Sequence, residues 1–170
     1  MWQEHGPLNI AFNLTGRPVF NLTKNEYAWT NNATVVYIDF PIGNGFSFSP
    51  GLQAYRVLDS QFQDDFYRFM EGLVSVFPQY KGRPLFIAGE GLAGHLIPLI
   101  SKYIVQKENP EVNLAGVAIG NGWVDPFYQF PSHNEYAIEK ELINGGRGFI
   151  LNLGYKVCEF MMLTEIPILS

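Results

Sequence analysis

Residues 84–103, PLFIAGEGLAGHLIPLISKY, carry the strongest structural signal in this sequence. The apolar and small residues at 85–89 predict a buried strand, and a glycine-rich turn follows at 89–94. Apolar residues then recur from Leu96 to Ile104 at the spacing of one helix face. A strand, a sharp turn and a helix form the setting in which α/β proteins place either a catalytic nucleophile or a phosphate-binding loop.

Segments on both sides of this stretch predict an α/β fold. The apolar, β-branched runs ATVVYIDF (33–40) and LAGVAIG (114–120) predict two further strands that are buried on both faces. A helical periodicity covers residues 57–77, between the first strand and the central one. The resulting order, β-α-β-α-β, is typical of a parallel sheet.

The two ends of the chain have a different character. Residues 1–34 contain short apolar segments between turn signals, which predicts an antiparallel edge ribbon. Helices are expected at 133–143 and 155–163, with a turn at the glycine-rich residues 145–148 between them.

Composition and charge exclude several classes of function. The chain has 170 residues, 47% of them hydrophobic and 16% charged, which indicates a globular protein. Its net charge of −5 and the lack of a basic run argue against a nucleic-acid partner. No apolar stretch reaches the roughly 18 residues that a membrane span requires. No spacing of His, Cys, Asp or Glu predicts a metal site, and we expect no cofactor.

Three N-x-[ST] sequons lie close together, at Asn13, Asn21 and Asn32. Glycosylation at these residues would indicate a lumenal protein of a lysosome or vacuole, or a secreted protein. The alternative, that Asn and Thr are simply common in turns, stays open. The single cysteine, Cys158, has no partner within the sequence.

The central turn, GEGLAG at residues 89–94, also fits the dinucleotide-binding pattern G-x-G-x-x-G. Two features weigh against that interpretation. The pattern normally occupies the first βα unit, and an acidic residue should end the next strand to hold the ribose. Here another unit precedes the turn, and the strand at 114–120 ends in glycine, so dinucleotide binding stays as an alternative.

Six segments resemble motifs of the serine carboxypeptidase family, in the family's order and spacing. The family motifs are E-x-G-P, N-x-Y-S-W, D-x-P-x-G-x-G-F-S, F-P-E-Y, G-E-S-Y-A-G-H and A-I-G-N-G. The matching segments, in the same order, are residues 4–7, 25–29, 39–47, 77–80, 89–95 and 118–122. One such match is weak, but six together give a specific resemblance that covers about residues 4–125.

The resemblance implies an α/β-hydrolase fold and the release of C-terminal residues from peptides at acidic pH. We expect this chain to be a fragment of that fold, with an edge β-ribbon and a β-α-β-α-β parallel-sheet core. The partial core is expected at residues 1–126, and the start of a helical cap or insertion at 127–170. Cys158 lies where the family's insertion carries disulfides, so its partner would lie outside this chain.

This chain departs from the family at the catalytic position. The family's nucleophilic serine corresponds to Gly91, which has no oxygen to attack a carbonyl. The next residue, Leu92, replaces a tyrosine but keeps the backbone N–H that helps to form the oxyanion hole. The family's glycine-rich oxyanion segment would precede Met1, and its catalytic Asp and His would follow Ser170. We therefore expect no intact catalytic residue in this chain.

The resemblance also assigns residues to substrate recognition. Glu4 and Glu90 match two family carboxylates that bind the C-terminal carboxylate of the substrate. Two adjacent acids share a proton, and the protonated one donates a hydrogen bond, most effectively at low pH. Trp123 and Gln3 match the family's substrate pocket. The alternatives stay open: an exposed Glu4, a Glu90 that stabilises a helix start, and a core tryptophan.

Other polar residues are weaker candidates. His5, His95 and His133 could in principle act as a general base, and Ser47 and Ser49 as nucleophiles. Structural roles are favoured for all five, since His95 matches a non-catalytic family histidine and the serines lie in a glycine-rich turn.

Three functions remain in view, and whether the chain is an enzyme stays open. The first is a serine-carboxypeptidase-like chain, related to enzymes that act on peptide C-termini, that is not hydrolytic itself. The second is a non-catalytic module that binds a peptide or protein partner through an exposed sheet edge and aromatic surface. The third is dinucleotide binding through residues 89–94.

Overall fold

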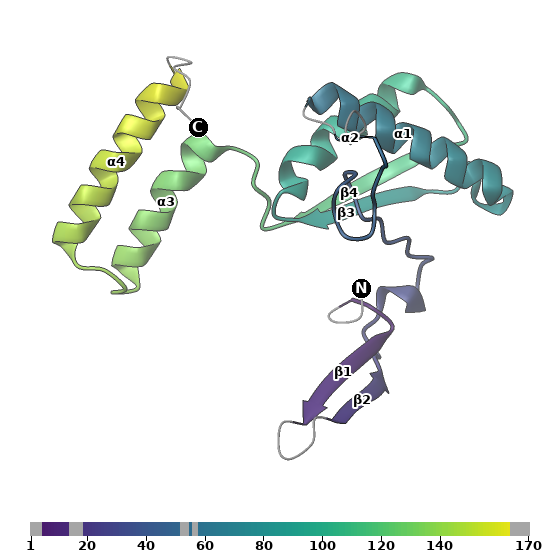
Figure 1. Cartoon of the computed structure of the whole chain (residues 1–170), viewed down its shortest axis with the longest axis horizontal. Helices are drawn as coiled ribbons and strands as arrows, with labels where there is room; N and C mark the ends of the chain where they lie inside the picture. The colour runs from purple at the N-terminus through teal and green to yellow at the C-terminus, as the bar shows by residue number, and fades with distance from the viewer. Residues whose placement is uncertain (1–4, 14–18, 52–54, 56–57, 164–170) are drawn as a thin grey trace. The chain divides into compact units, whose positions relative to one another are not determined.

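The structure is a computed structural model that describes residues 5–13, 19–51, 55 and 58–163. The chain forms two compact units, Met1–Arg56 and Val57–Ser170. Figure 1 shows their helices and strands along the chain. None of the helices in these described ranges is long and apolar enough to cross a membrane.

The first unit is built on an antiparallel hairpin of β1 (Leu8–Asn13) and β2 (Val19–Lys24), which confirms the predicted ribbon. A short 3-10 helix, η1 (Trp29–Asn31), follows. Buried Asn25 ties this region to the start of the chain, because its Nδ2 donates a hydrogen bond to the Gly6 carbonyl at 2.8 Å. Two motifs that lie some twenty residues apart therefore form one local structure.

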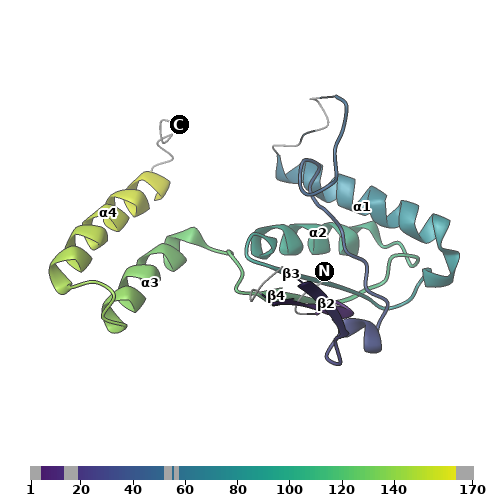
Figure 2. The ribbon, with the colours of Figure 1, turned by 60° about the horizontal axis from the view of Figure 1, so that its bottom comes forward.

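The second unit contains a parallel two-stranded sheet of β3 (Leu85–Glu90) and β4 (Leu114–Gly120). Helix α2 (Ala93–Lys107) connects the strands and packs against both of them. Helix α1 (Asp59–Val76) packs on α2 rather than on the strands, as Figure 2 shows. A short 3-10 helix, η3 at Pro78–Tyr80, follows α1. The predicted βαβ unit is confirmed.

The apolar core of this unit lies along the two helices. The buried apolar side chains are Phe66, Tyr67, Met70 and Val74 of α1, Ile97, Ile100 and Ile104 of α2, and Val112. The opposite face of the sheet carries Phe86, whose side chain is 70% exposed and lies beside Gly116 of β4. Only one face of the sheet is therefore covered by helices of this unit.

The prediction of a buried strand at residues 33–40 is wrong for this structure. These residues form no strand, and most of them are exposed, Val36 at 49%. Their β-branched and aromatic side chains favour an extended backbone, but a strand also needs a neighbour to complete its hydrogen bonds. In the described part of the chain, β3 and β4 pair only with each other, so the observed core is βαβ preceded by a helix.

The C-terminal region forms two helices that pack against each other, α3 (Pro126–Glu139) and α4 (Gly145–Leu163). Helix α3 begins seven residues before the predicted 133, because Pro126 occupies its first turn and Asp125 caps it. The Asp125 carboxylate accepts the Phe127 N–H at 3.0 Å.

The predicted turn at 145–148 is instead the first turn of α4. A Cβ at Gly148 would lie 2.5 Å from Cδ1 of Ile138 on α3, so the absence of a side chain lets the helices approach. Packing against α3 therefore outweighs the low helix propensity of these glycines.

Candidate functional site

A sharp turn joins the carboxyl end of β3 to the start of α2, and Gly91 lies at its tip. The φ angle of Gly91 is +61°, which residues with a side chain rarely adopt. A Cβ placed on Gly91 would meet no heavy atom within 4 Å. The turn therefore has the left-handed backbone at residue 91 that is typical of a nucleophile elbow, and it leaves open space where the side chain of residue 91 would be.

Small residues allow the strand and helix to meet at this elbow. A Cβ on Gly89 would lie 2.5 Å from the Cβ of Ala93. A Cβ on Gly94 would lie 2.7 Å from both the Gly122 Cα and the Trp123 nitrogen. Gly89 and Gly94 of GEGLAG are thus explained by packing and Gly91 by its positive φ, without any need for a bound phosphate.

Backbone hydrogen bonds tie the elbow to the end of β4. The Gly91 N–H donates to the Gly120 carbonyl at 3.2 Å, and the Gly91 carbonyl accepts from the Trp123 N–H at 2.8 Å and the Gly94 N–H at 2.9 Å. Within the described residues, the Leu92 N–H has no hydrogen-bond acceptor. This donor at the helix start is free to bind an acceptor from outside, as an oxyanion-hole donor must be.

Two predicted recognition residues flank the elbow. Glu90 is exposed at the end of β3. Its side chain lies beside Gly120 of β4, since a Cβ placed on Gly120 would be 3.9 Å from Cγ of Glu90. Trp123 follows β4, is 45% exposed, and has its ring centroid 6.2 Å from that of Phe130. Both residues lie at the carboxyl edge of the sheet, where open α/β sheets bind ligands.

Two other predicted recognition residues, Gln3 and Glu4, lie outside the described residues. The adjacent His5 is described, and its ring stacks on Tyr37 at 5.5 Å and lies 4.7 Å from Trp29. The structure thus groups Glu90, Gly91, Leu92 and Trp123 in the second unit.

The remaining histidines have local partners on the surface. His95 Nε2 lies 3.1 Å from Oδ1 of Asp59 and links the first turns of α2 and α1. His133 is exposed, and its ring lies 6.3 Å from that of Phe130. In the parts of the chain that the structure describes, no three His, Cys, Asp or Glu side chains could together hold a metal ion.

The predicted serines belong to turns. The Ser47 N–H donates to the Asn44 carbonyl at 3.0 Å, and the Ser49 hydroxyl accepts the Gly51 N–H at 3.4 Å. Cys158 is half-buried on α4. Among the sequons, Asn21 and Asn32 are exposed, and Asn13 is the last residue of β1.

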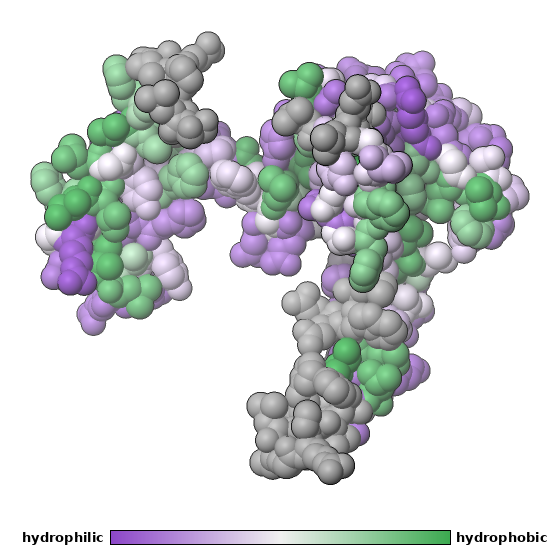
Figure 3. All heavy atoms as spheres, in the orientation of Figure 1, coloured by the Kyte–Doolittle hydropathy of each residue, from purple (hydrophilic) through white to green (hydrophobic). Residues whose placement is uncertain are grey.

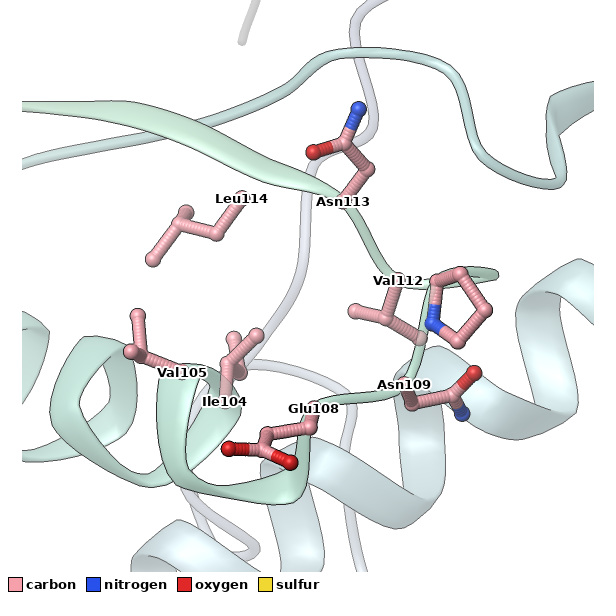
Figure 4. A pocket seen from close by; sticks show the side chains of 8 residues that line it. Ile104, Val105, Glu108, Asn109, Val112, Asn113 and Leu114 are labelled. Atoms are coloured by element: carbon pink, nitrogen blue, oxygen red, sulfur yellow. The ribbon is translucent and has the colours of Figure 1, made fainter.

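A shallow hollow of about 170 Å³ lies at the other end of the sheet. Figure 4 shows Ile104 and Val105 of α2 on one side and Val112 and Leu114 on the other. Leu114 is paired with Leu85 at the amino end of the parallel strands, whereas Gly91 follows their carboxyl end. The hollow is therefore separate from the elbow.

Sequence reasoning missed one residue of the site, Gln129 on α3. Its side chain makes hydrogen bonds with three residues of the segment 122–125, which includes Trp123. The signal for it was present, because Asp125-Pro126 is a helix-start pattern and a glutamine soon after such a start can bond back to the cap.

Comparisons with known proteins agree with this geometry. A sequence profile described as serine carboxypeptidase matches residues 1–148. "Serine carboxypeptidase S10 family member 1" of Dictyostelium discoideum is 38% identical over 136 residues, which are 79% of this chain and 31% of that protein. The "Pheromone-processing carboxypeptidase KEX1" of Verticillium alfalfae is 35% identical over 86% of this chain and 24% of its own length.

The solved structure of a prohormone-processing carboxypeptidase from Saccharomyces cerevisiae, KEX1(delta)p, is similar to this chain with a TM-score of 0.80 at 26% identity. The match covers 96% of this chain and 36% of that structure. The chain thus spans about a third or less of the length of these relatives.

Proposed function

Because this chain belongs to the serine carboxypeptidase family and has an α/β-hydrolase-type fold, we propose that it is a carboxypeptidase-like polypeptide that does not itself hydrolyse peptides. One observation carries the proposal. Gly91 occupies the tip of the elbow with a φ of +61°, where the family has its nucleophilic serine. Without an oxygen at this position the acyl-enzyme cannot form.

Hydrolysis is tested directly on the purified chain. An N-blocked dipeptide is incubated with it at acidic pH, and release of the C-terminal amino acid is followed by mass spectrometry. We expect no release above the rate in buffer. Release that scales with the concentration of the chain and survives repurification would overturn the proposal.

We further propose that the edge around the elbow keeps affinity for a peptide C-terminus. Glu90 would act with Glu4 as the carboxylate-binding pair, and Trp123 with Gln3 would contact the side chain of the peptide. The exposed Glu90 and Trp123 and the unpaired Leu92 N–H support this proposal. A carboxyl group can donate to a carboxylate only when it is protonated, so we expect stronger binding in acid.

Variants at residue 90 separate this mechanism from non-specific binding. Titration of the Leu92 amide signal in NMR with a short peptide should saturate at about pH 4.5 and weaken several-fold at about pH 7. Glu90→Gln keeps a donor at every pH and should make the affinity independent of pH, whereas Glu90→Ala should abolish it. A C-terminally amidated peptide is the control, and equal binding of both peptides would contradict carboxylate recognition.

A second candidate function, a non-catalytic module that binds a protein partner, has an observation of its own. Apolar side chains are exposed on α3 and α4 as well as on the open sheet face, and Figure 3 shows them over this helix pair. Exposed apolar areas of this kind mark interaction sites. Recovery of only chaperones in a pull-down from a lumenal extract would count against this function.

No observation favours the dinucleotide alternative. β4 ends in Gly120, followed by Asn121 and Gly122, so no carboxylate stands there for a ribose. A lumenal or secreted location, and a division into a core at 1–126 and an insertion at 127–170, are part of the proposal by analogy with the family.

A further inference from the structure

The side chain of Gln129 connects α3 to the segment after β4, which in turn is hydrogen-bonded to the elbow. We propose that Gln129 is a positioning residue, which holds the segment 122–125 so that Trp123 fixes the orientation of the Gly91–Leu92 peptide. This inference rests on the proposed function in one respect only, the use of the Leu92 N–H as a donor to a bound ligand. The geometry itself is a property of the free chain.

Gln129 uses both ends of its amide group. Its Oε1 accepts the N–H groups of Val124 and Asp125, each at 2.9 Å, and its Nε2 donates to the Gly122 carbonyl at 2.8 Å. The amide therefore bonds to residues on both sides of Trp123. A residue that only capped α3 would bond to the N–H groups at its start and would not need the Gly122 carbonyl.

The constraint on Trp123 is passed to Gly91 through the backbone. The Trp123 N–H donates to the Gly91 carbonyl at 2.8 Å. The peptide unit is planar and trans, so the carbonyl of Gly91 and the N–H of Leu92 lie in one plane and point in opposite directions. Fixing the carbonyl toward Trp123 thus aims the Leu92 N–H away from the Trp123 N–H.

Gln129 is itself well anchored for this role. It lies in the first turns of α3, whose start is fixed by Pro126 and by the Asp125 cap. Its backbone carbonyl accepts the Ser132 hydroxyl at 2.7 Å, and its side chain is half-buried. The neighbouring Phe130 ring lies 6.2 Å from the Trp123 ring, which adds an apolar contact between α3 and the same segment.

Amide hydrogen exchange measured by NMR on the intact chain tests the proposal. In the wild-type chain, we expect the Trp123 amide and the Gln129 side-chain NH₂ to be protected from exchange. Exchange of the Trp123 amide at the random-coil rate, in a chain whose β3 and β4 amides are protected, would overturn the proposal.

Gln129→Ala removes all three side-chain bonds. We expect the Trp123 amide to exchange roughly ten-fold faster or more, as the loss of neutral hydrogen bonds implies, and the Leu92 amide signal to shift. The matched control is Gln106→Ala, which removes an exposed glutamine of α2 and should change neither signal. Unchanged Trp123 protection in a folded Gln129→Ala chain would also overturn the proposal.

Gln129→Glu keeps the test decisive if the alanine variant does not fold. An ionised glutamate accepts the Val124 and Asp125 N–H groups but cannot donate to the Gly122 carbonyl, whereas a protonated one does both. Protection of Trp123 should therefore be native-like at about pH 3.5 and fall roughly ten-fold at about pH 7, while Asp125 stays protected at both. Equal protection of Trp123 at both pH values would contradict the positioning role.

The hydrogen-exchange test of the positioning role does not depend on whether the chain binds a peptide. If the chain binds no peptide but Trp123 protection follows Gln129, the proposed function fails and the positioning role stands. If peptide binding is observed and Trp123 protection ignores Gln129, only the positioning role fails.

Discussion

Glycine has opposite effects at two helical positions of this chain. At Gly94 a Cβ would lie 2.7 Å from backbone atoms of the segment after β4, whereas at Gly72 on α1 a Cβ would meet nothing within 4 Å. Backbone atoms cannot move aside as a flexible side chain can. Gly94 is therefore required by contact, and Gly72 only lowers the helix propensity of α1.

Gly94→Ala should accordingly lower the free energy of unfolding by about 1–3 kcal/mol, as overpacking does. Gly72→Ala is the matched control and should raise the same quantity by about 0.5–1 kcal/mol. Urea unfolding followed by circular dichroism measures both. Equal stability of the two variants would show that α2 can retreat from the turn after β4 without loss.

Lys107 at the end of α2 lies over two aromatic rings, with Nζ 4.5 Å from the ring centroid of Tyr103 and 5.6 Å from that of Tyr67. The hydrogen bond that the Lys107 ammonium donates to the Tyr103 hydroxyl is the largest cause that raises the pKa of Lys107 above its ordinary 10.5, and desolvation opposes it. A raised pKa means that the interaction stabilises the fold throughout the neutral range. That stabilisation is lost only as the pH rises through the raised value.

Tyr103→Phe should therefore move the titration midpoint of Lys107 downward. The ¹³Cε shift of this lysine, followed in NMR between about pH 9 and pH 12, reports the midpoint. Tyr80→Phe, which leaves both rings in place, is the control. A midpoint that does not move in Tyr103→Phe would show that the hydrogen bond contributes nothing.

At the scale of elements, the α3–α4 pair depends on one buried amide. Asn134 is 1% exposed, and its Nδ2 donates to the Gly148 carbonyl at 3.0 Å and to Oδ1 of Asn152 at 2.7 Å. A Cβ on Gly148 would lie 2.5 Å from Cδ1 of Ile138, so α4 approaches α3 closely beside this amide. The Asn134 side chain thus links α3 to α4 through two hydrogen bonds at this close approach.

Asn134→Ala removes both bonds and leaves a small void, so it should cost about 1–3 kcal/mol of the local opening free energy of α4. Hydrogen exchange of the α4 amides should accelerate, while that of β3 and β4 stays as in the wild type. The control is Glu135→Ala, which replaces the next, exposed residue of α3. It should change neither the exchange of the α4 amides nor that of the β3 and β4 amides. Acceleration of equal size in both variants would assign the effect to helix propensity instead.

The elements that the sequence predicted well are those with a local signal. The strand at 114–120 has the predicted bounds, and α2 has the predicted apolar spacing, because periodicity and glycine punctuation lie within the element itself. Residues 33–40 were misassigned because a strand depends on a distant pairing partner that composition cannot report.

In the candidate site, too, the residues with a local sequence signal were predicted and those that depend on contacts between elements were not. The glycine at position 91 could be identified from the motif. For Gln129 the helix-start pattern indicated a bond back to the cap, but its bond to the Gly122 carbonyl arises only where α3 meets the segment after β4. The glycines at 145–148 were read as a turn for the same reason, since their helical conformation depends on contact with α3.

At the scale of the whole molecule, the exposed sequons give a test of the proposed lumenal or secreted location. Asn21 and its Thr23 are exposed on β2, and Asn32 and its Thr34 are exposed after η1. An exposed acceptor of this type is open to the glycosylation machinery of the secretory pathway. The first unit would then carry sugar at two exposed positions.

Expression of the chain with a secretion signal should give a product whose mass falls on treatment with an N-glycosidase. Asn21→Gln and Asn32→Gln should each remove one glycan from the ladder seen on a gel. Asn44→Gln, which lies in no sequon, is the control and should leave the ladder unchanged. A product without any glycan would contradict the secretory proposal.

The empty space at Gly91 makes the elbow a convenient attachment point for a reporter group. A cysteine at residue 91 would stand at the start of α2, where the partial positive charge of a helix end favours the thiolate. Gly91→Cys should therefore react with iodoacetamide faster than the half-buried Cys158, which peptide mass mapping would measure. Residue 91 would then accept a fluorophore or spin label that reports on the conformation of the elbow.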